Sequence, residues 1–225
     1  IVLSANAQGR PLSDVVADIR AAVERTPLPE GYFITLGGQF QAQEEASRLI
    51  AGLALVSMAL MLAVLYTRYQ SATLSVLIMA NIPLALVGAV LGLWLSGQPL
   101  SVAALVGFVT LAGISVRNGI LKVSHYLNLM RLEGERFDQA MIVRGSMERL
   151  SPVLMTALVT ALALAPLLFE AEQPGTEILH PVAVVIFGGL ISATLLDTFM
   201  TPAMFWLWGR PAAERLQKAH QGEVF

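Results

Sequence analysis

The sequence predicts a membrane-spanning all-α bundle of five helices, preceded by a small N-terminal α/β piece. Of the 225 residues, 56% are hydrophobic and only 13% are charged, and the mean hydropathy is +0.68. A soluble domain carries about 25% charged residues. Apolar runs also recur at the length of about 20 residues that a bilayer-crossing helix requires. The composition therefore indicates a multi-span membrane protein.

Charge and cysteine content exclude some chemistry but name no substrate. The formal net charge of −2 says nothing about nucleic acid, and no nucleic-acid partner is expected. The absence of cysteine excludes disulfides and thiolate chemistry. The chain opens at Ile1 with a β-prone stretch and without a signal-type segment. We therefore expect it to be part of a longer polypeptide.

Residues 1–38 are predicted to be the last piece of a water-exposed domain. Residues 1–5 and 32–36 are short and β-prone, and apolar residues between Leu12 and Val23 recur at helical spacing. A strand–helix–strand piece of this size buries too little apolar surface to fold alone. We expect it to complete a domain that precedes it.

Residues 39–208 are predicted to contain the membrane-spanning helices, and 209–225 a polar tail. The predicted spans are 49–66, 73–95, 102–126, 152–169 and 179–208. Pro83 in the second and Pro202 in the last each free a backbone carbonyl, which needs a partner inside a bundle. A charged segment of helical character joins the third and fourth spans.

The distribution of Lys and Arg predicts the orientation. These residues lie in the first and third connections and in the tail, whereas the second connection has none and the fourth has only acids. The positive-inside rule then places the first and third connections and the C-terminus in the cytoplasm. Five spans place the N-terminal piece outside, which in a bacterium is the periplasm.

Arg117 is the most informative residue of the third span. An arginine at the centre of a membrane helix costs about 2.5–3.5 kcal/mol on insertion scales, and it cannot lose its proton. Thr110, Gly113 and Ser124 fall on the same helical face as Arg117, which suits a packed, protein-facing seam. Lys122 lies about 140° further round the helix, and we expect it to extend to the membrane surface.

Two other polar residues lie inside predicted spans. Asn81 stands in the second and Asp197 in the last, about two turns from its cytoplasmic end. Asp197 is either an interior hydrogen-bonding group or part of an ion path. The three histidines fall on different elements without metal-ligand spacing. No nucleophile–base set or phosphate-binding loop is present, so the sequence predicts no catalytic residues, no metal site and no cofactor.

Four segments resemble one transporter family, the resistance–nodulation–division (RND) efflux pumps. Residues 113–121 (GISVRNGIL) resemble its tenth-helix motif, and 149–156 (RLSPVLMT) are similar to the entry of its eleventh helix. Residues 174–181 (PGTEILHP) resemble the heavy-metal/cation branch rather than the multidrug branch. Residues 29–40 are typical of the join between the porter domain and the eighth helix. The resemblance implies a piece of a periplasmic porter domain followed by helices eight to twelve of twelve (TM8–TM12).

The resemblance also assigns a proton relay. Arg117 occupies the position of a relay lysine that pairs with two fourth-helix aspartates, with Asn118 beside it. Thr156 matches the hydroxyl of the eleventh helix, and Arg149 a basic residue at its cytoplasmic side. Because arginine keeps its proton, Arg117 can only favour the ionised form of nearby carboxylates, which then carry the proton.

The implied function is proton-driven efflux of heavy-metal cations or small toxic compounds across the bacterial inner membrane. The implied partners are membrane lipid, two further copies in a homotrimer, a periplasmic adaptor protein and an outer-membrane channel. Two alternatives stay open. One is a multidrug-type permease; the other is a non-transporting sensor or assembly protein of the same fold, in which Arg117 is only a structural charge.

Overall fold

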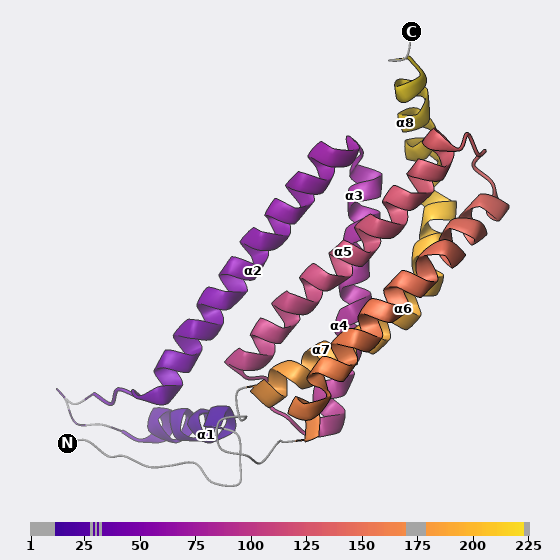
Figure 1. Cartoon of the computed structure of the whole chain (residues 1–225). Coiled ribbons are helices and arrows are strands. Elements are labelled where there is room, and N and C mark those ends of the chain that lie inside the picture. Colours follow the sequence, from indigo (N-terminus) through magenta and orange to yellow (C-terminus); the bar gives the residue numbers. More distant parts are fainter. Residues whose placement is uncertain (1–11, 28, 30, 32, 170–178, 223–225) are drawn as a thin grey trace. The chain divides into compact units, whose positions relative to one another are not determined.

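The computed structural model describes residues 12–27, 29, 31, 33–169 and 179–222 (Figure 1). The chain divides into two compact units, Ile1–Gly52 and Leu53–Phe225. Helix α2 (Gln39–Tyr69) crosses the boundary between them. Each unit is described by itself.

The first unit contains α1 (Leu12–Arg25) and the beginning of α2. A loose ion pair joins Arg20 of α1 to Glu44 of α2 at 3.6 Å, between two exposed side chains. Helix α1 agrees with the helix predicted from the spacing of apolar residues after Leu12. The second predicted strand, at 32–36, is not observed: residues 33–36 are neither helix nor strand. A strand persists only when its backbone groups pair with a neighbour, and the described residues of this unit supply none. The other predicted strand, at 1–5, lies outside the described residues.

The remaining elements confirm the predicted membrane-type helical bundle. Five helical segments of the described chain are long and apolar enough to cross a bilayer, and they run as follows: Gln41–Tyr69, Ala72–Ser96, Val102–Leu132, Gln139–Phe169 and Leu179–Gln217. The second segment is interrupted at Ala80, which separates α3 (Ala72–Met79) from α4 (Asn81–Ser96).

Local sequence signals fix several helix ends. The Ser71 side chain accepts a hydrogen bond from the Leu74 N–H at the start of α3. Ser101 does the same for Ala104 at the start of α5 (Val102–Leu132), at 3.2 Å. Each hydroxyl satisfies a backbone donor that the first helical turn leaves free. Helix α4 ends at Gly97, whose φ of +66° is the left-handed conformation that glycine adopts without strain.

Glycines bring α4 into close contact with α7 (Leu179–Met204). A Cβ built on Gly88 would lie 2.2 Å from the Ser192 Cβ and 2.3 Å from the Gly188 carbonyl oxygen. The close approach lets the Ser192 hydroxyl donate to the Leu84 carbonyl of α4 at 2.7 Å. Small residues permit such backbone approach in membrane bundles, where lipid supplies no hydrophobic drive between helices.

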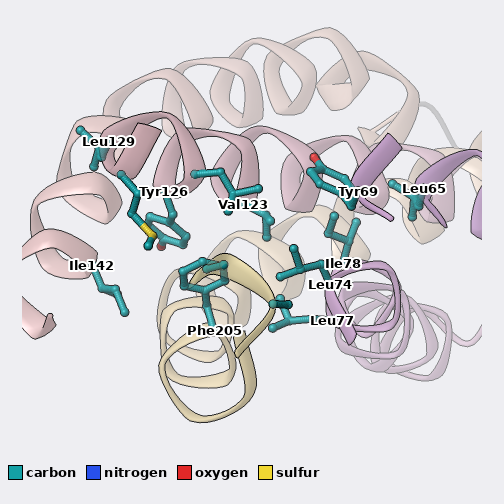
Figure 2. Close-up of a cluster of buried hydrophobic side chains, with 14 of the residues drawn as sticks. Leu65, Tyr69, Leu74, Leu77, Ile78, Val123, Tyr126, Leu129, Ile142 and Phe205 are labelled. Atoms are coloured by element: carbon teal, nitrogen blue, oxygen red, sulfur yellow. The ribbon is translucent and has the colours of Figure 1, made fainter. Parts of the chain in front are cut away.

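An apolar cluster joins α3, α5 and α6 (Gln139–Phe169) to the end of the last span (Figure 2). At its centre is Phe205, the first residue of the π-helical turn η1 (Phe205–Gly209), which leads into α8 (Arg210–Gly222). The fully buried Phe205 ring lies 4.9 Å from the ring of Tyr126 and 5.6 Å from that of Phe137, centroid to centroid. The cluster packs α3, α5 and α6 around the turn η1, which follows directly after α7.

Candidate functional site

A buried ion pair between Lys122 of α5 and Asp197 of α7 is the central feature of the helical bundle. The Lys122 Nζ lies 2.6 Å from Asp197 Oδ2, and the two side chains are 3% and 4% exposed. The same ammonium donates a hydrogen bond to the backbone carbonyl of Asp197 at 2.9 Å. These contacts replace the water that an ammonium group would otherwise need.

The prediction that Lys122 extends to the membrane surface is therefore wrong. Helix α5 buries the face that carries Ser115, Gly119 and Lys122, spaced three to four residues apart. Successive residues of a helix are about 100° apart, so Arg117 lies about 140° from Lys122 and falls outside that face. The prediction failed because helical periodicity shows which residues share a face but not which face packs against a neighbour.

Asn81 and Thr201 complete a buried polar cluster, which we define as Asn81, Lys122, Asp197 and Thr201. The Thr201 Oγ1 lies 2.9 Å from Asn81 Oδ1 and within hydrogen-bonding distance of Asp197 Oδ1. Gly119 makes room for the amide, because a Cβ there would lie 2.6 Å from Asn81 Nδ2. The four residues come from α4, α5 and α7, so the cluster joins three helices.

Two atoms of the cluster have no aligned hydrogen bond. They are Asn81 Nδ2 and Asp197 Oδ2, and neither forms a hydrogen bond with the described residues. Asp197 Oδ2 nevertheless faces the Lys122 ammonium at 2.6 Å, so it is held by charge rather than by a well-directed hydrogen bond. Asn81 Nδ2 has no such compensation and is a buried donor without a hydrogen-bond acceptor.

Arg117 lies on the outside of the described bundle. Its side chain is exposed and makes no ion pair or hydrogen bond within the part of the chain that the structure describes. Thr110 and Gly113 are exposed on the same side, whereas Ser124 is half-buried and its hydroxyl lies 2.7 Å from that of Tyr69. The described helices therefore leave the Arg117 face of α5 uncovered.

The other residues of the predicted relay are not joined to Arg117 or to one another by any hydrogen bond or ion pair of the described residues. Asn118 is buried at 6% exposure. Thr156 is exposed, and its hydroxyl donates to the Val153 carbonyl one turn back in α6 at 2.9 Å. Arg149 is half-buried, with one terminal nitrogen 3.4 Å from His125 Nδ1.

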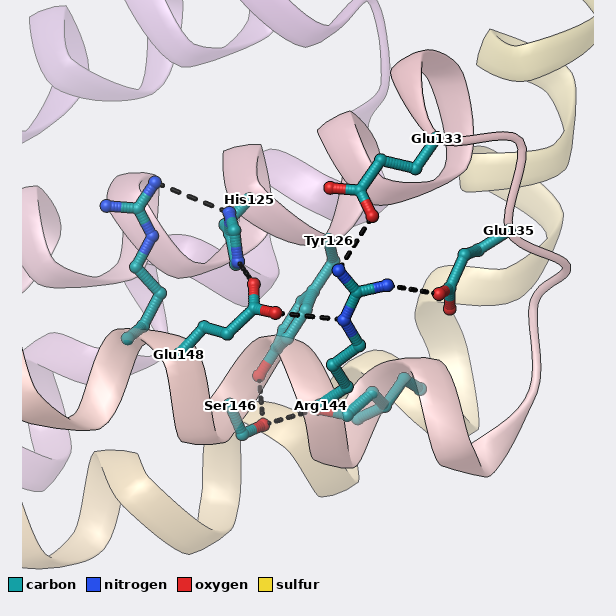
Figure 3. Close-up of polar contacts among 9 residues, drawn as sticks. His125, Tyr126, Glu133, Glu135, Arg144, Ser146 and Glu148 are labelled. Carbon is teal, nitrogen blue, oxygen red and sulfur yellow. Dashed lines mark hydrogen bonds and ion pairs between the residues drawn. The ribbon is translucent and has the colours of Figure 1, made fainter.

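A charged network surrounds the connection between α5 and α6 (Figure 3). Arg144 contacts Glu133 at 2.7 Å, Glu148 at 2.9 Å, and Glu135 as well. Glu148 also lies 2.7 Å from His125 Nε2. Exposed pairs of this kind contribute about 0–1 kcal/mol each. The network holds the end of α5 against the start of α6.

Within the described chain, no group of three or more His, Cys, Asp or Glu side chains converges as a metal site requires. His180, for example, is buried at the start of α7, with Nδ1 2.9 Å from the Leu167 carbonyl of α6. That contact joins two helix ends.

The fold and the site together define a multi-span membrane protein with ionisable groups inside its helical bundle, an arrangement typical of ion-coupled transporters. Residues 1–209 match the model of the AcrB/AcrD/AcrF family, and the chain belongs to this family of RND transporters. Members of the family are secondary active transporters rather than enzymes.

Similar proteins carry names that refer to metals. The chain is 36% identical over 208 residues to the cobalt-zinc-cadmium resistance protein CzcA of Cupriavidus metallidurans, a match covering 92% of this chain and 19% of CzcA. It is 37% identical over 226 residues to the nickel and cobalt resistance protein CnrA of the same organism, covering 97% of this chain and 21% of CnrA. A crystal structure of a heavy metal efflux pump matches with a TM-score of 0.79 and 35% identity, covering 91% of this chain and 20% of that one. The chain thus spans about a fifth of the length of these relatives.

Proposed function

We propose that this chain is the C-terminal membrane portion of a proton-driven RND permease that exports heavy-metal cations. The similarity to CzcA and CnrA over more than nine-tenths of the chain carries the proposal. Both names denote metal resistance, which favours the metal branch over the multidrug branch. In this reading the five spans are helices eight to twelve of a twelve-helix permease.

The exposed position of Arg117 supports a role for helices outside this chain. An unpaired arginine facing hydrocarbon would cost about 2.5–3.5 kcal/mol or more, so a helix bearing carboxylates fits this face better than lipid does. Arg117 would hold such carboxylates in their ionised form until the next proton arrives. Asn118, Thr156 and Arg149 complete the proposed relay on α5 and α6.

The complete permease is proposed to work in the bacterial inner membrane as a homotrimer. A periplasmic adaptor protein and an outer-membrane channel would continue the export path. The basic connections and the tail would face the cytoplasm, and residues before α2 the periplasm, because Lys and Arg cluster in alternate connections.

Substitution of Arg117 in the complete permease tests the proposal. Arg117→Met deletes the charge and keeps an unbranched side chain, so metal resistance should fall to the level of cells without the pump while the protein still reaches the membrane. Arg117→Lys keeps the charge without the planar guanidinium and should retain part of the resistance. Arg136→Met is the matched control, because Arg136 is exposed in the α5–α6 connection.

Growth on cobalt, zinc, cadmium and nickel, with membrane levels measured by blotting, provides the readout. Full resistance in Arg117→Met cells would remove Arg117 from the relay. Resistance to organic compounds but to none of the metals, in cells with the parent pump, would favour the multidrug alternative.

A further inference from the structure

The buried polar cluster is separate from the face that carries Arg117. Asn81, Lys122, Asp197 and Thr201 are 1–3% exposed, whereas Arg117 is exposed on the same helix as Lys122. A buried ion pair is weak evidence for stability, because well-packed apolar residues are often as stable or more stable in its place. Ionisable groups inside a membrane bundle are instead frequent in proton and ion pathways. The number of hydrogens available to the contacts of the cluster bears on which of these roles applies.

The Thr201 hydroxyl has one hydrogen but two neighbouring acceptor oxygens. One is Asn81 Oδ1 at 2.9 Å, and the other is Asp197 Oδ1. A hydroxyl donates one hydrogen bond, and an ionised carboxylate and an amide oxygen donate none. With Asp197 ionised and the amide oriented in this way, one of the two oxygen–oxygen contacts has no hydrogen in it.

Two proton arrangements resolve this mismatch. In the first, Asp197 carries a proton on Oδ1, which it donates to Thr201 Oγ1, and the Thr201 hydroxyl donates to Asn81 Oδ1. In the second, Asp197 is ionised and accepts from the Thr201 hydroxyl, while the Asn81 amide turns by 180° and donates from Nδ2 to Thr201 Oγ1. Turning the amide breaks no hydrogen bond at Nδ2, because that nitrogen has no partner among the described residues.

We propose that the buried polar cluster is a proton-binding site, additional to the Arg117 face, in which Asp197 takes up and releases one proton. Uptake from water forms an O–H bond at Asp197 Oδ1, and release breaks that bond and returns the proton to water. The cluster then alternates between a net charge of +1 and zero, while Lys122 keeps its own proton and its hydrogen bond to the Asp197 carbonyl. A role of the cluster in transport rests on the proposed function, whereas proton binding by Asp197 does not depend on it.

The groups around Asp197 support exchange at this carboxyl. Lys122 and Tyr126 of α5 are the titratable groups that act on or near it. Helices α3 and α4 and the turn η1 contain no ionisable residue. Among the charged residues of α6, Arg144 and Glu148 are engaged with each other. Glu148 is the other acid of these elements, and it is held by Arg144 and His125 rather than by the cluster.

The site also lies where two helices are interrupted. Asn81 is the first residue of α4, directly after the break at Ala80, and Thr201 precedes Pro202 and the π-helical turn η1. Irregular turns of this kind in membrane helices often accompany functional sites. A proton that reorients the Asn81 amide therefore changes the hydrogen bonding at both interruptions.

Infrared spectroscopy of the purified complete permease in lipid tests proton binding without any transport. We expect the carbonyl stretch of a protonated buried carboxyl group to grow as the pH falls and to be missing from Asp197→Asn. Lys122→Met removes the ammonium that lies 2.6 Å from Asp197 Oδ2, and it should raise the midpoint, because a neighbouring cation favours the ionised carboxylate. An identical spectrum for parent and Asp197→Asn, or an unchanged midpoint in Lys122→Met, would overturn the proposal.

Transport by a double variant tests whether the site is used. Single substitutions leave a buried charge unpaired, whereas Lys122→Met combined with Asp197→Leu removes both charges at similar volume. We expect the double variant to reach the membrane at the parental level and to lose metal resistance. Resistance equal to that of the parent would show that the site takes no part in transport. If the double variant is missing from the membrane, metal resistance of Thr201→Val cells decides instead, because this variant keeps the ion pair and removes only the hydroxyl between Asn81 and Asp197. Lost resistance would support a role of the cluster in transport, and parental resistance would contradict it. A parent that binds the proton but exports no metal would instead contradict the proposed function alone.

Discussion

Substituting Gly88 by alanine probes the closest helix contact in the bundle. The new Cβ would lie 2.2 Å from the Ser192 Cβ and 2.3 Å from the Gly188 carbonyl oxygen. Ordinary contacts begin at about 3.4 Å, so α4 and α7 must separate by roughly 1 Å. Neither neighbouring atom is the free end of a flexible side chain, so a rotamer change cannot relieve the clash.

The expected loss follows from three contributions. Overpacking costs about 1–3 kcal/mol. Separation of the helices also weakens the hydrogen bond from Ser192 to the Leu84 carbonyl, and such bonds average about 0.6 kcal/mol in membrane proteins. Alanine regains about 0.5–1 kcal/mol of helix propensity. The balance is a loss of about 1–3 kcal/mol for Gly88→Ala, dominated by the steric clash.

Thermal unfolding of the purified complete permease, followed by size-exclusion chromatography, measures this loss. Gly52→Ala is the matched control, because nothing lies within 4 Å of a Cβ at that position of α2. The reasoning is refuted if Gly88→Ala and Gly52→Ala melt at the same temperature. Gly188→Ala should destabilise the same contact, and its effect should not add to that of Gly88→Ala, since the two residues meet.

Three further outcomes are expected. A cysteine at Gln98 should react with a membrane-impermeant reagent in intact cells and one at Gln139 should not, because Lys and Arg cluster in the connection next to Gln139; equal labelling would contradict the orientation. Tyr126→Phe removes the hydroxyl that lies 2.7 Å from Ser146 Oγ and should cost about 0.6 kcal/mol in denaturant unfolding; a loss above about 2 kcal/mol would mean that the ring itself is displaced. Replacing His180 by leucine removes the side chain that contacts the Leu167 carbonyl at the end of α6. The free energy of unfolding should fall by about 1 kcal/mol, whereas an unchanged melting temperature would show that the contact contributes nothing.

The described structure contains two cations inside the apolar part of α5, and they occupy opposite environments. Lys122 is enclosed with a carboxylate and a carbonyl oxygen, whereas Arg117 is exposed. The pairing of Lys122 is internal to the chain, so its charge is compensated here. The described residues supply no partner for Arg117.

Elements whose signals are local could be predicted from the amino-acid sequence alone. Apolar runs of sufficient length predicted five membrane-type helices, because a helix satisfies its own backbone hydrogen bonds wherever it lies. Ser71, Ser101 and Gly97 were not predicted as helix ends, although the contacts through which they end the helices also span only a few residues. The four motifs resembling RND pumps also indicated the family, which the comparisons confirm.

Features that depend on partners far apart in the chain could not be predicted without the folded structure. Asn81 and Asp197 were recognised as polar residues inside spans, but the pairing of Asp197 with Lys122, 75 residues away, has no local signal. The predicted strand at 32–36 failed for the same reason, since a strand needs a partner and a helix does not. Helical periodicity placed Arg117 and Lys122 on different faces of α5. Packing against α7, which buries apolar surface and pairs one charge, selected the face of Lys122.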